Sequence, residues 1–425
     1  LQVSVAQESG CNSRSAYFYN GGVKETKYIE TFCGYRLEGT GNHRIKVITP
    51  ECKVVWKYLD EINVGDMACI NRTSQLWPIE YLDISKYHTD ENQPKYLDEK
   101  WGELLGLLAG DGHWTNDKAI SITVGEKAFE KYLMNTFRDL FGKVAYYPDK
   151  RKVDVGRVSA HGTKIRKFFD NLGWTIECTT KTKQVPHSIM QSPKSVVCAF
   201  LRGLFETDGC ASGTAISLSS ASYELSRQVQ LLLLNIGITS NLSKSKRENG
   251  VEYRVRLKGS KSKRIFVQHI GFISDRKKQC LKDVMSSVSY RGSNEGVPFF
   301  YEYAERLKKI YPDLRHKLEK TTKYTPYWKI KKIAEQYCLS ETTKVQLNQL
   351  IDYDYFFDPI IKTQTKQAHV FDLNVPNGAM FIGNGFTNHN TTISACIAAY
   401  ETYKLIKKDN PQKYYGLPAS NNIQI

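Results

Sequence analysis

Two nine-residue segments of one pattern lie 97 positions apart in the middle of the chain. Residues 104–112 read LLGLLAGDG and residues 201–209 read LRGLFETDG. Each copy is followed by a strand-like run, AISITV at 119–124 or AISLS at 215–219, and then by a segment of helical period that stops at a glycine. Each half closes on a similar tetrapeptide, NLGW or HIGF. The repeat predicts two α-β-β-α-β-β-α halves, related by a pseudo-two-fold axis, over about residues 96–290.

Glycines inside these apolar segments indicate close packing of two helices. Gly106 and Gly203 stand within helical runs, where an interior glycine costs about 1 kcal/mol unless two backbones must approach. Helices packed along these glycines would end side by side, so Asp111 and Asp208 are expected to be neighbouring carboxylates. Paired carboxylates suit Mg²⁺ binding and phosphodiester hydrolysis. One Asp-Gly alone is better explained as a helix-ending turn, but two copies in matched contexts favour the metal site.

The charge balance indicates a polyanionic partner. Lys and Arg number 60 against 44 Asp and Glu, which gives a net charge of +16. Nucleic acid is the simplest such partner, and a merely basic protein is the alternative. Residues 253–258, YRVRLK, predict a strand with one basic face that can contact phosphates and base edges. The residues expected to contact DNA are Lys150, Arg151, Lys152, Arg157, Lys244, Lys246, Arg247, Arg254, Arg256, Lys258, Lys261 and Lys263.

Cysteine spacing and hydropathy exclude several other classes of protein. None of the ten cysteines is paired at CxxC spacing, which argues against a zinc knuckle and for free thiols in a reducing compartment. No apolar run approaches the roughly 20 residues of a membrane span. Residues 1–20 do not have the pattern of a signal peptide.

The repeated region resembles the LAGLIDADG homing endonucleases in their single-chain, double-motif form, through both nonapeptides and their spacing. The resemblance implies a monomer that cuts double-stranded DNA at an intein-less host allele. It implies that Asp111 and Asp208 bind the catalytic Mg²⁺. In KTKQVPHSI (181–189), Lys183 matches a lysine that assists catalysis in the family, with an ordinary loop lysine as the alternative.

Both flanks of the repeat have a β pattern. Residues 17–49 and 368–392 contain short alternating apolar runs separated by glycines, so the simplest interpretation is one β domain interrupted by an insertion. The fold class is mixed α+β and multidomain, an all-β domain interrupted by a pseudo-two-fold α/β domain. The expected parts are 1–95 and 351–390 for the two pieces of the β domain, 96–290 for the endonuclease, 291–350 for a basic helical extension or linker, and 391–425 for a host fragment.

The flanking pair resembles the Hint splicing domain of inteins. The string GYRLEGTGNHRIKV (34–47) matches the block whose His, here His43, polarises the N-terminal scissile peptide, with Thr40 and Asn42 holding its carbonyl. At the other end, GNGFTNHNT resembles the C-terminal block, and Asp372 resembles the acidic residue of the block before it. The residues that the C-terminal block implies are His389, Asn390 and the acceptor Thr391.

The residue types at the C-terminal block suit splicing chemistry on their own account. The Asn390 side-chain amide can attack its own carbonyl carbon to form a succinimide and break the chain, while a neighbouring His moves protons. The Thr391 hydroxyl can accept the migrating acyl group as an ester. These reactions need no cofactor. Taken alone, the Asn-His-Asn string has turn residues as its alternative explanation.

Two positions depart from the intein pattern. Cys11 lies only 32 residues before His43 without the expected start pattern around it, so the true first residue and strands are expected to be missing, through truncation or a split intein. Ala379 stands where the family usually has a His, which affects the coupling of Asn cyclisation to earlier steps.

Residues 391–425 resemble the segment after the phosphate-binding loop of phage terminase large subunits, which implies the cytoplasm of a prokaryotic or phage-infected cell. Basic helices are expected at 301–320 and 328–339, either as an additional DNA-contacting module or as a linker. Two competing functions stay open: a freestanding LAGLIDADG endonuclease or RNA maturase with non-splicing β flanks, and an inactive DNA-binding remnant.

Overall fold

The computed structural model describes most of the chain. The described residues are 4–7, 12–14, 17–72, 76–89, 93–115, 119–150, 155–174, 180–248, 250–287, 296–311, 324–337, 339–375, 380–389 and 407–408. The expected host fragment, with its predicted helix from Thr392 to Lys407, lies almost wholly outside these residues, as do Cys11 and Ala379. Within the described ranges, no helix is long and apolar enough to cross a bilayer.

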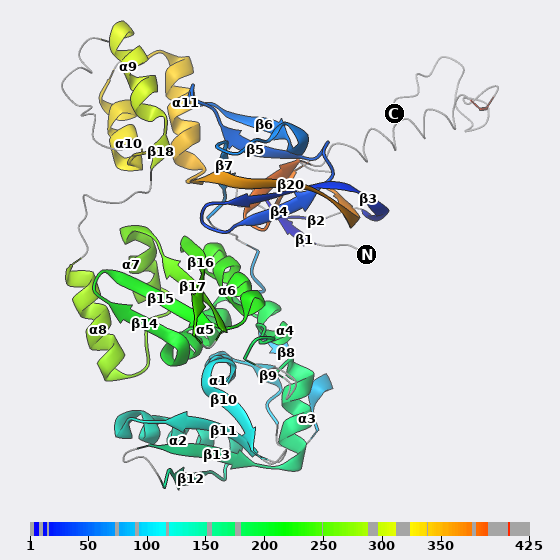
Figure 1. Cartoon of the computed structure of the whole chain (residues 1–425), viewed down its shortest axis with the longest axis vertical. Coiled ribbons are helices and arrows are strands. Elements are labelled where there is room, and N and C mark those ends of the chain that lie inside the picture. Colours follow the sequence, from blue (N-terminus) through cyan, green and yellow to red (C-terminus); the bar gives the residue numbers. More distant parts are fainter. Residues whose placement is uncertain are drawn as a thin grey trace.

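Strands from both ends of the chain form one eight-stranded antiparallel sheet (Figure 1). Its order is β21-β22-β5-β7-β20-β3-β4, with β6 paired to β5. The strands are β3 (Tyr17–Thr31), β4 (Arg36–Gly39), β5 (Arg44–Ile48), β6 (Val54–Tyr58), β7 (Met67–Ile70), β20 (Phe356–Asn374), β21 (Met380–Gly383) and β22 (Phe386–His389). A small hairpin of β1 (Ser4–Ala6) and β2 (Asn12–Arg14) precedes them. We call residues 4–72 and 354–389 the β unit.

The long strands β3 and β20 hold the two ends of the β unit together. Their pairing runs from Ile360 opposite Thr31 to Asn374 opposite Tyr17, with register shifts at two places. Strand β22 then pairs with β5, and Asn388 lies opposite Ile45. The sheet surrounds a core in which Ile29, Tyr35, Ile45, Phe356 and Phe386 are buried. Apolar residues contributed by both ends of the sequence therefore stabilise one fold.

The middle of the chain contains two halves of the same topology, which confirms the predicted α-β-β-α-β-β-α repeat. The first half is α1 (Glu99–Asp111), β10 (Gly112–Thr115), β11 (Ala119–Val124), α2 (Lys127–Phe141), β12 (Ala145–Pro148), β13 (Gly156–His161) and α3 (Thr163–Leu172). The second half is α5 (Lys194–Asp208), β14 (Gly209–Ser212), β15 (Ala215–Ser220), α6 (Tyr223–Ile236), β16 (Ser240–Arg247), β17 (Gly250–Leu257) and α7 (Gly259–His269). The sheets have matching orders, β10-β11-β13-β12 and β14-β15-β17-β16.

Short elements join and extend these halves. They are η1 (Leu59–Glu61), β8 (Leu82–Asp83), η2 (Ser85–Tyr87), β9 (Tyr96–Leu97), α4 (His187–Met190) and α8 (Asp275–Ser286). The two halves share one hydrophobic core, which includes Leu105, Phe137, Phe169, Phe200 and Phe205. Glycines end the second helix of each half as predicted, with Gly142 after α2 and Gly237 after α6. This region is a mixed α/β domain.

Helices α1 and α5 pack against each other at backbone distance, as the interior glycines predict. A Cβ atom added to Gly106 would lie 2.0 Å from the Phe200 carbonyl oxygen, and one added to Gly203 would lie 2.2 Å from the Glu103 carbonyl oxygen. A side chain at either position would overlap the opposing helix. The two glycines therefore allow the helices to run in contact to their C-terminal ends.

A third part, which we call the helical unit, packs on the β unit (Figure 1). It comprises β18 (Val297–Pro298), α9 (Phe300–Ile310), β19 (Tyr324–Thr325), α10 (Tyr327–Gln336) and α11 (Glu341–Asp352). Its core contains Phe300, Ile330 and Leu347 together with Ile48 and Met67 of the sheet. A core of this kind shows that the region 291–350 is folded structure, so the linker alternative is wrong for its described residues.

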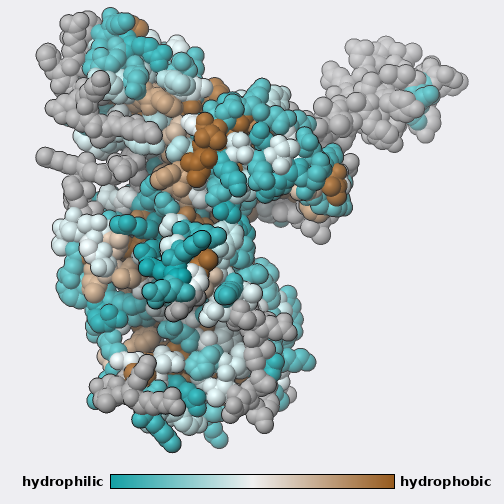
Figure 2. Space-filling view, in the orientation of Figure 1, coloured by the Kyte–Doolittle hydropathy of each residue, from teal (hydrophilic) through white to brown (hydrophobic). Residues whose placement is uncertain are grey.

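The β unit also contacts the second half of the repeat. The Cys33 carbonyl accepts hydrogen bonds from Leu242 N at 2.9 Å and from Gln230 Nε2 at 2.7 Å. Leu234 of α6 belongs to the core of the β unit. Figure 2 shows a largely hydrophilic face, with its most hydrophobic patch over the part of the β unit that contains β20.

Candidate active sites and nucleic-acid interface

Asp111 and Asp208 end the paired helices α1 and α5, as the repeat predicts. Asp111 is exposed and Asp208 is half-buried. Partial desolvation where the two helix ends converge raises the pKa of both carboxyls, and that of Asp208 reaches about 6. The Lys183 charge opposes this rise in Asp208, the Asp111 charge adds to it, and the Lys277 charge opposes it again. The two carboxylates are therefore close enough to repel each other, and cations lie close by.

Each carboxylate helix has a lysine at its C-terminal end. Lys183 Nζ donates to the Gly110 carbonyl of α1. Lys277 Nζ donates to the Gly209 carbonyl at 2.7 Å and to carbonyls of the last turn of α5, including Phe205 at 3.2 Å and Glu206. Burial lowers the pKa of Lys277. An ammonium group at a helix C-terminus is favoured by the helix dipole.

The sequence interpretation included Lys183 but missed Lys277. Lys183 lies in the loop after α3, and Lys277 lies in α8 after α7, so each follows the last helix of its half. The signal was present, because each lysine comes a few residues after the closing tetrapeptide NLGW or HIGF. The two lysines do not align when the halves are superposed by sequence, because Lys183 lies nine residues after its tetrapeptide and Lys277 lies five residues after its own.

The acidic site fits a hard divalent cation. Two carboxylates whose pKa values are raised by burial gain from a bound cation, and the negative ends of two helix dipoles converge beside them. Among the described residues no cluster of three or more His, Cys, Asp or Glu side chains surrounds a point. Asp111 and Asp208 would therefore share the cation with carbonyl, water or phosphate oxygens, as Mg²⁺ commonly does.

The second site lies in the β unit around His43. Its Nε2 lies 2.8 Å from Asn388 Oδ1, and the Asn388 Nδ2 donates to the Phe386 carbonyl at 2.8 Å. Burial lowers the pKa of His43, whereas the Asn388 hydrogen bond and the Asp372 charge favour its protonated form. Burial in turn raises the pKa of the Asp372 carboxyl. Burial therefore favours the neutral form of the His43 imidazole, and the contact with Asn388 holds the ring in one orientation.

His389 lies next to this centre at the end of β22. Its Nδ1 is 3.4 Å from Arg44 Nη2, and its ring packs edge-on against Trp56 with centroids 4.9 Å apart. Burial lowers its pKa, with smaller contributions from the Arg44 and His43 charges. The structure thus brings His43, Asp372 and His389 together. Asn390 and Thr391 lie outside the described residues.

Thr40 and Asn42 lie in the turn that leads to His43. The Thr40 carbonyl accepts a hydrogen bond from His43 N at 2.9 Å, which fixes the backbone of this turn. The Asn42 side chain is exposed. The predicted roles of both residues stay predictions.

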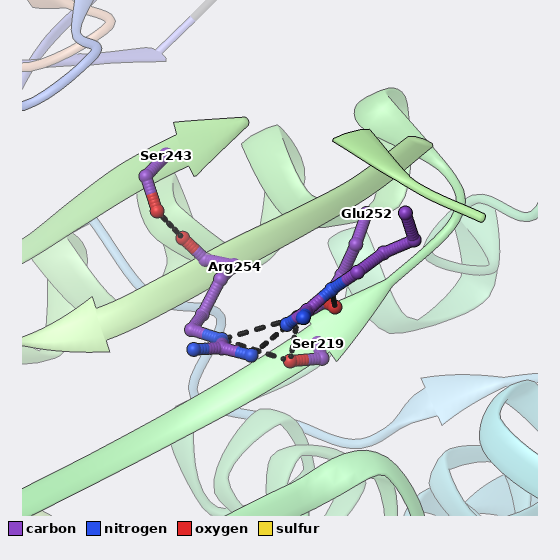
Figure 3. Close-up of polar contacts among 5 residues, drawn as sticks. Ser219, Ser243, Glu252 and Arg254 are labelled. Atoms are coloured by element: carbon purple, nitrogen blue, oxygen red, sulfur yellow. Dashed lines mark hydrogen bonds and ion pairs between the residues drawn. The ribbon is translucent and has the colours of Figure 1, made fainter. Parts of the chain in front are cut away.

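One face of the second sheet carries arginines among small polar side chains. The Glu252 carboxylate accepts from Arg254 Nη2 at 2.6 Å, from Arg247 Nε at 2.6 Å and from Ser219 Oγ at 2.9 Å. Figure 3 shows the Arg254 guanidinium directed toward Glu252 and Ser219. Hydrogen bonding to Arg247 is the main reason that the pKa of Glu252 falls to about 2. The pairing holds both arginines extended along the sheet.

Strand alternation divides the predicted DNA-contacting residues between two faces. Arg254 and Arg256 share a face, because Val255 and Leu257 between them are buried, as predicted. Lys244 and Lys246 pair with Tyr253 and Val251, so they point to the opposite face. The two lysines therefore do not share the basic face of β17, and their contacts with DNA stay a prediction.

Two further lysines of the predicted set contact the β unit. Lys258 Nζ donates to Cys33 Sγ at 3.2 Å and lies over the rings of Phe32 and Phe356. Lys261 Nζ donates to the Asp354 carboxylate. Their positive charges are thus engaged within the chain, between the second half of the repeat and the β unit.

The remaining basic positions have varied surroundings. Lys263 Nζ donates to the Thr214 carbonyl at 2.6 Å. In the first half, Arg157 lies over the Tyr147 ring, 4.9 Å from its centroid, and Lys150 is exposed. Arg151 and Lys152 lie outside the described residues.

Comparisons with known proteins identify the second half of the repeat. Residues 195–271 match a family described as a LAGLIDADG-like domain. The matched segment contains α5 with Asp208, the whole β14–β17 sheet and α7. The chain thus contains a LAGLIDADG-like domain within a mixed α/β structure.

Curated relatives extend the similarity over most of the chain. A replicative DNA helicase DnaB of Rhodothermus marinus is 26% identical over 402 residues, which cover 87% of this chain and 40% of that protein. A replication factor C small subunit of Methanocaldococcus jannaschii is 25% identical over 353 residues, or 80% of this chain and 18% of that protein. A glutamine–fructose-6-phosphate aminotransferase of the same species is 23% identical over 415 residues, or 88% and 36%. The chain spans less than half the length of these relatives.

Solved structures are similar at low identity. The homing endonuclease I-DmoI, described in a study of its mesophilic variants, matches with a TM-score of 0.35 and 15% identity, over 44% of this chain and 98% of that chain. The full-length DUF199/WhiA protein of Thermatoga maritima matches with a TM-score of 0.33 and 16% identity, over 62% and 84%.

Proposed function

We propose that the chain is a DNA-cutting protein-splicing element, in which a LAGLIDADG-type homing endonuclease interrupts a Hint-type splicing domain. The main observation that supports this proposal is that one chain contains two separate candidate reactive centres. The acidic pair Asp111 and Asp208 lies in the repeat, and the His43–Asn388 contact lies in a β unit built from the sequences on either side of it. A nuclease alone has no need of the second centre.

The identities of the relatives support a mobile insertion. A replicative DNA helicase, a replication factor subunit and an aminotransferase are different kinds of protein, yet each aligns with at least 80% of this chain over a minor part of its own length. A segment that proteins of such different kinds share cannot be the part that performs their individual reactions. A mobile element of the same kind, inserted in each of these proteins, accounts for the pattern.

The nuclease centre supports hydrolysis of a phosphodiester bond. Asp111 and Asp208 would hold Mg²⁺, which supplies Lewis-acid stabilisation and a bound water of lowered pKa. Lys183 and Lys277 place positive charge beside the carboxylates, where charge develops on phosphate oxygens. Arg254 and Arg256 project from the sheet face that lines duplex DNA in this proposal.

The splicing centre supports cleavage after Asn390. In the proposed step the Asn390 side-chain nitrogen attacks its own carbonyl carbon, a succinimide forms, and the peptide bond to Thr391 breaks with a proton delivered to the Thr391 nitrogen. His389 directly precedes Asn390, and His43 is hydrogen-bonded two residues upstream of it, at Asn388. Neutral imidazoles at both places can accept and donate the protons.

The host protein is a separate question. We propose the terminase-like ATPase that residues 391–425 resemble, with the cytoplasm of a prokaryotic or phage-infected cell as its location. The similarity to DnaB relatives makes a replicative DNA helicase the competing host. The sequence directly upstream of the insertion decides: a Gly-Lys end of a phosphate-binding loop supports an ATPase, and the residues before that loop distinguish the two.

One assay series separates the proposal from its alternatives. The purified chain is incubated while its intact mass is followed, and intein-less host DNA is added with Mg²⁺. We expect cleavage after Asn390 that Asn390→Ala abolishes, and DNA cutting that Asp111→Asn abolishes. A freestanding endonuclease or maturase predicts no cleavage at Asn390, and an inactive remnant predicts no DNA cutting.

A further inference from the structure

Helix α6 of the second half of the repeat lies between two hydrophobic cores. One side of this helix faces the core that the two halves of the repeat share, and it contributes Leu225, Val229, Leu232, Leu233 and Ile236. The other side faces the β unit, where Leu234 is 1% exposed and belongs to the core of that unit, with Leu231 packed against it. A helix on the surface of a domain normally buries one stripe, so a helix that buries two sides is shared by two folded parts.

Polar contacts follow the same side of α6. At the start of the helix, the Arg36 guanidinium lies over the Tyr223 ring, 4.7 Å from its centroid. Further along, Gln230 Nε2 donates to the Cys33 carbonyl at 2.7 Å. Tyr223, Gln230 and Leu234 are spaced by seven and four residues, which places them in one stripe along the helix. This stripe fixes α6 against the β unit from its first turn to its last.

Leu234 contacts the turn between β21 and β22. Asn384 and Gly385 form this two-residue turn with φ values of 52° and 87°, the positive values that hairpin turns of this length favour. A Cβ atom added to Gly385 would lie 2.6 Å from Leu234 Cδ2 and 3.1 Å from Ile70 Cγ2. The turn therefore closes on the leucine side chain and leaves no space for a side chain at Gly385.

Strand β22 links this turn to His43. Asn71 N donates to the Gly385 carbonyl at 2.7 Å, which fixes the turn to the end of β7. The Phe386 carbonyl directly after the turn accepts from Asn388 Nδ2 at 2.8 Å, and Asn388 Oδ1 lies 2.8 Å from His43 Nε2. Because Gly385 and Asn388 belong to the same short hairpin, a shift of the turn also moves the amide that orients the imidazole.

We infer that Leu234 is a positioning residue of the splicing centre, a side chain of the nuclease region that holds the β21–β22 hairpin where Asn388 meets His43. The inference rests on the proposed splicing function, and it makes the inserted nuclease region a structural part of that reaction. Side chains in a close-packed core have little freedom to move, so a filled contact at the turn restricts the positions of the hairpin. Loss of the contact slows the reaction at Asn390 without a change to any group that takes part in it.

The test compares two neighbouring leucines of α6 in the full chain. Leu234→Ala removes side-chain atoms from the contact with the hairpin, and Leu233→Ala removes the same atoms from the core of the repeat. Both leucines are buried, so both variants should lose thermal stability, and the pair separates a local effect from general destabilisation. Leu234→Met keeps the side-chain volume and should behave as the unsubstituted chain does. Leu234→Val and Leu233→Val are the milder pair if an Ala variant unfolds at the assay temperature.

Two readouts are followed well below the unfolding temperature: intact mass for cleavage after Asn390, and the imidazole ¹⁵N shifts of His43. We expect Leu234→Ala to slow cleavage about 10-fold or more and to change the His43 shifts, whereas Leu233→Ala changes neither. Equal effects of the two variants, or no effect of Leu234→Ala on either readout, overturn the inference alone. If the unsubstituted chain does not cleave after Asn390, the splicing proposal fails, and the His43 shifts still decide whether Leu234 holds the hairpin in place.

Discussion

His43 on β5 and Asn388 on β22 are joined by a hydrogen bond of 2.8 Å between Nε2 and Oδ1. Because the Asn388 Nδ2 donates to the Phe386 carbonyl, its oxygen faces the imidazole. The network therefore assigns the proton of neutral His43 to Nε2 and leaves Nδ1 as the basic nitrogen. Asn388 thus selects the tautomer of a histidine that lies 345 positions upstream in the chain.

Asn388→Leu should release this constraint. Because the hydrogen bond raises the pKa of His43 against the effect of burial, its loss should lower that pKa further and allow both tautomers. Imidazole ¹⁵N shifts of selectively labelled protein measure both changes, and intact mass follows cleavage after Asn390, which should slow about 10-fold or more. Asn135→Leu, at an exposed position of α2, is the control. A His43 spectrum identical to that of the unsubstituted chain contradicts the assignment.

Asp208→Asn should stabilise the metal-free protein at pH 7. The folded-state pKa of Asp208 is raised from 3.8 to about 6, so the unfolded state releases its proton first and stability falls as pH rises between these values. The shift corresponds to at most about 3 kcal/mol, which partial solvent access reduces to about 1–2 kcal/mol. Thermal unfolding at pH 4 and pH 7 measures the difference, which should be small at pH 4. Mg²⁺ should stabilise the original chain and not the variant.

Lys277→Met should reduce DNA cutting by about 100-fold or more while DNA binding changes little. The lysine is expected to act on charge that develops in the transition state, so its loss affects the rate more than the affinity. Single-turnover cutting and a binding titration separate the two quantities. Lys278→Met is the matched control, because that neighbour points outward to Asp275 at 3.4 Å. If the two substitutions had equal effects, Lys277 would have no specific role in DNA cutting.

Gly106→Ala should destabilise the nuclease region by about 1–3 kcal/mol, because its Cβ would overlap the Phe200 carbonyl of the opposing helix. Gly125→Ala should be nearly neutral, since the nearest atom to its added Cβ is Val155 Cγ2 at 3.9 Å. Thermal unfolding and DNA cutting provide the readouts. If Gly106→Ala retained full stability, helices α1 and α5 would have to lie farther apart than the structure places them.

Arg256→Ala and Lys258→Ala should affect DNA binding differently. Arg256 lies on the exposed face of the second sheet, so its loss should reduce the slope of log affinity against log salt by about 0.9. Lys258 donates to Cys33 and lies over aromatic rings of the β unit, so its loss should leave that slope unchanged and lower thermal stability. Affinity titrations at several salt concentrations test both expectations. If Lys258→Ala also reduced the slope of log affinity against log salt, Lys258 would contact DNA after all.

The predictability of this protein varied with the range of the interactions involved. The nonapeptides predicted two helices in backbone contact and the convergence of Asp111 and Asp208, because interior glycines and helix periodicity are local signals. The alternation in YRVRLK correctly placed Val255 inside and Arg254 outside. The same local pattern did not predict that Lys244 would point to the other face, because that depends on the register between β16 and β17.

The amino-acid sequence by itself determined the repeat, the helix ends and the residue types of both reactive centres, since periodicity, capping and side-chain chemistry operate over a few residues. Only the tertiary structure decided which distant groups meet. It joined His43 to Asn388, and it placed Lys258 in a contact between the second half of the repeat and the β unit. Contacts of this kind depend on how strands pair and surfaces pack over hundreds of residues, and no local pattern encodes them.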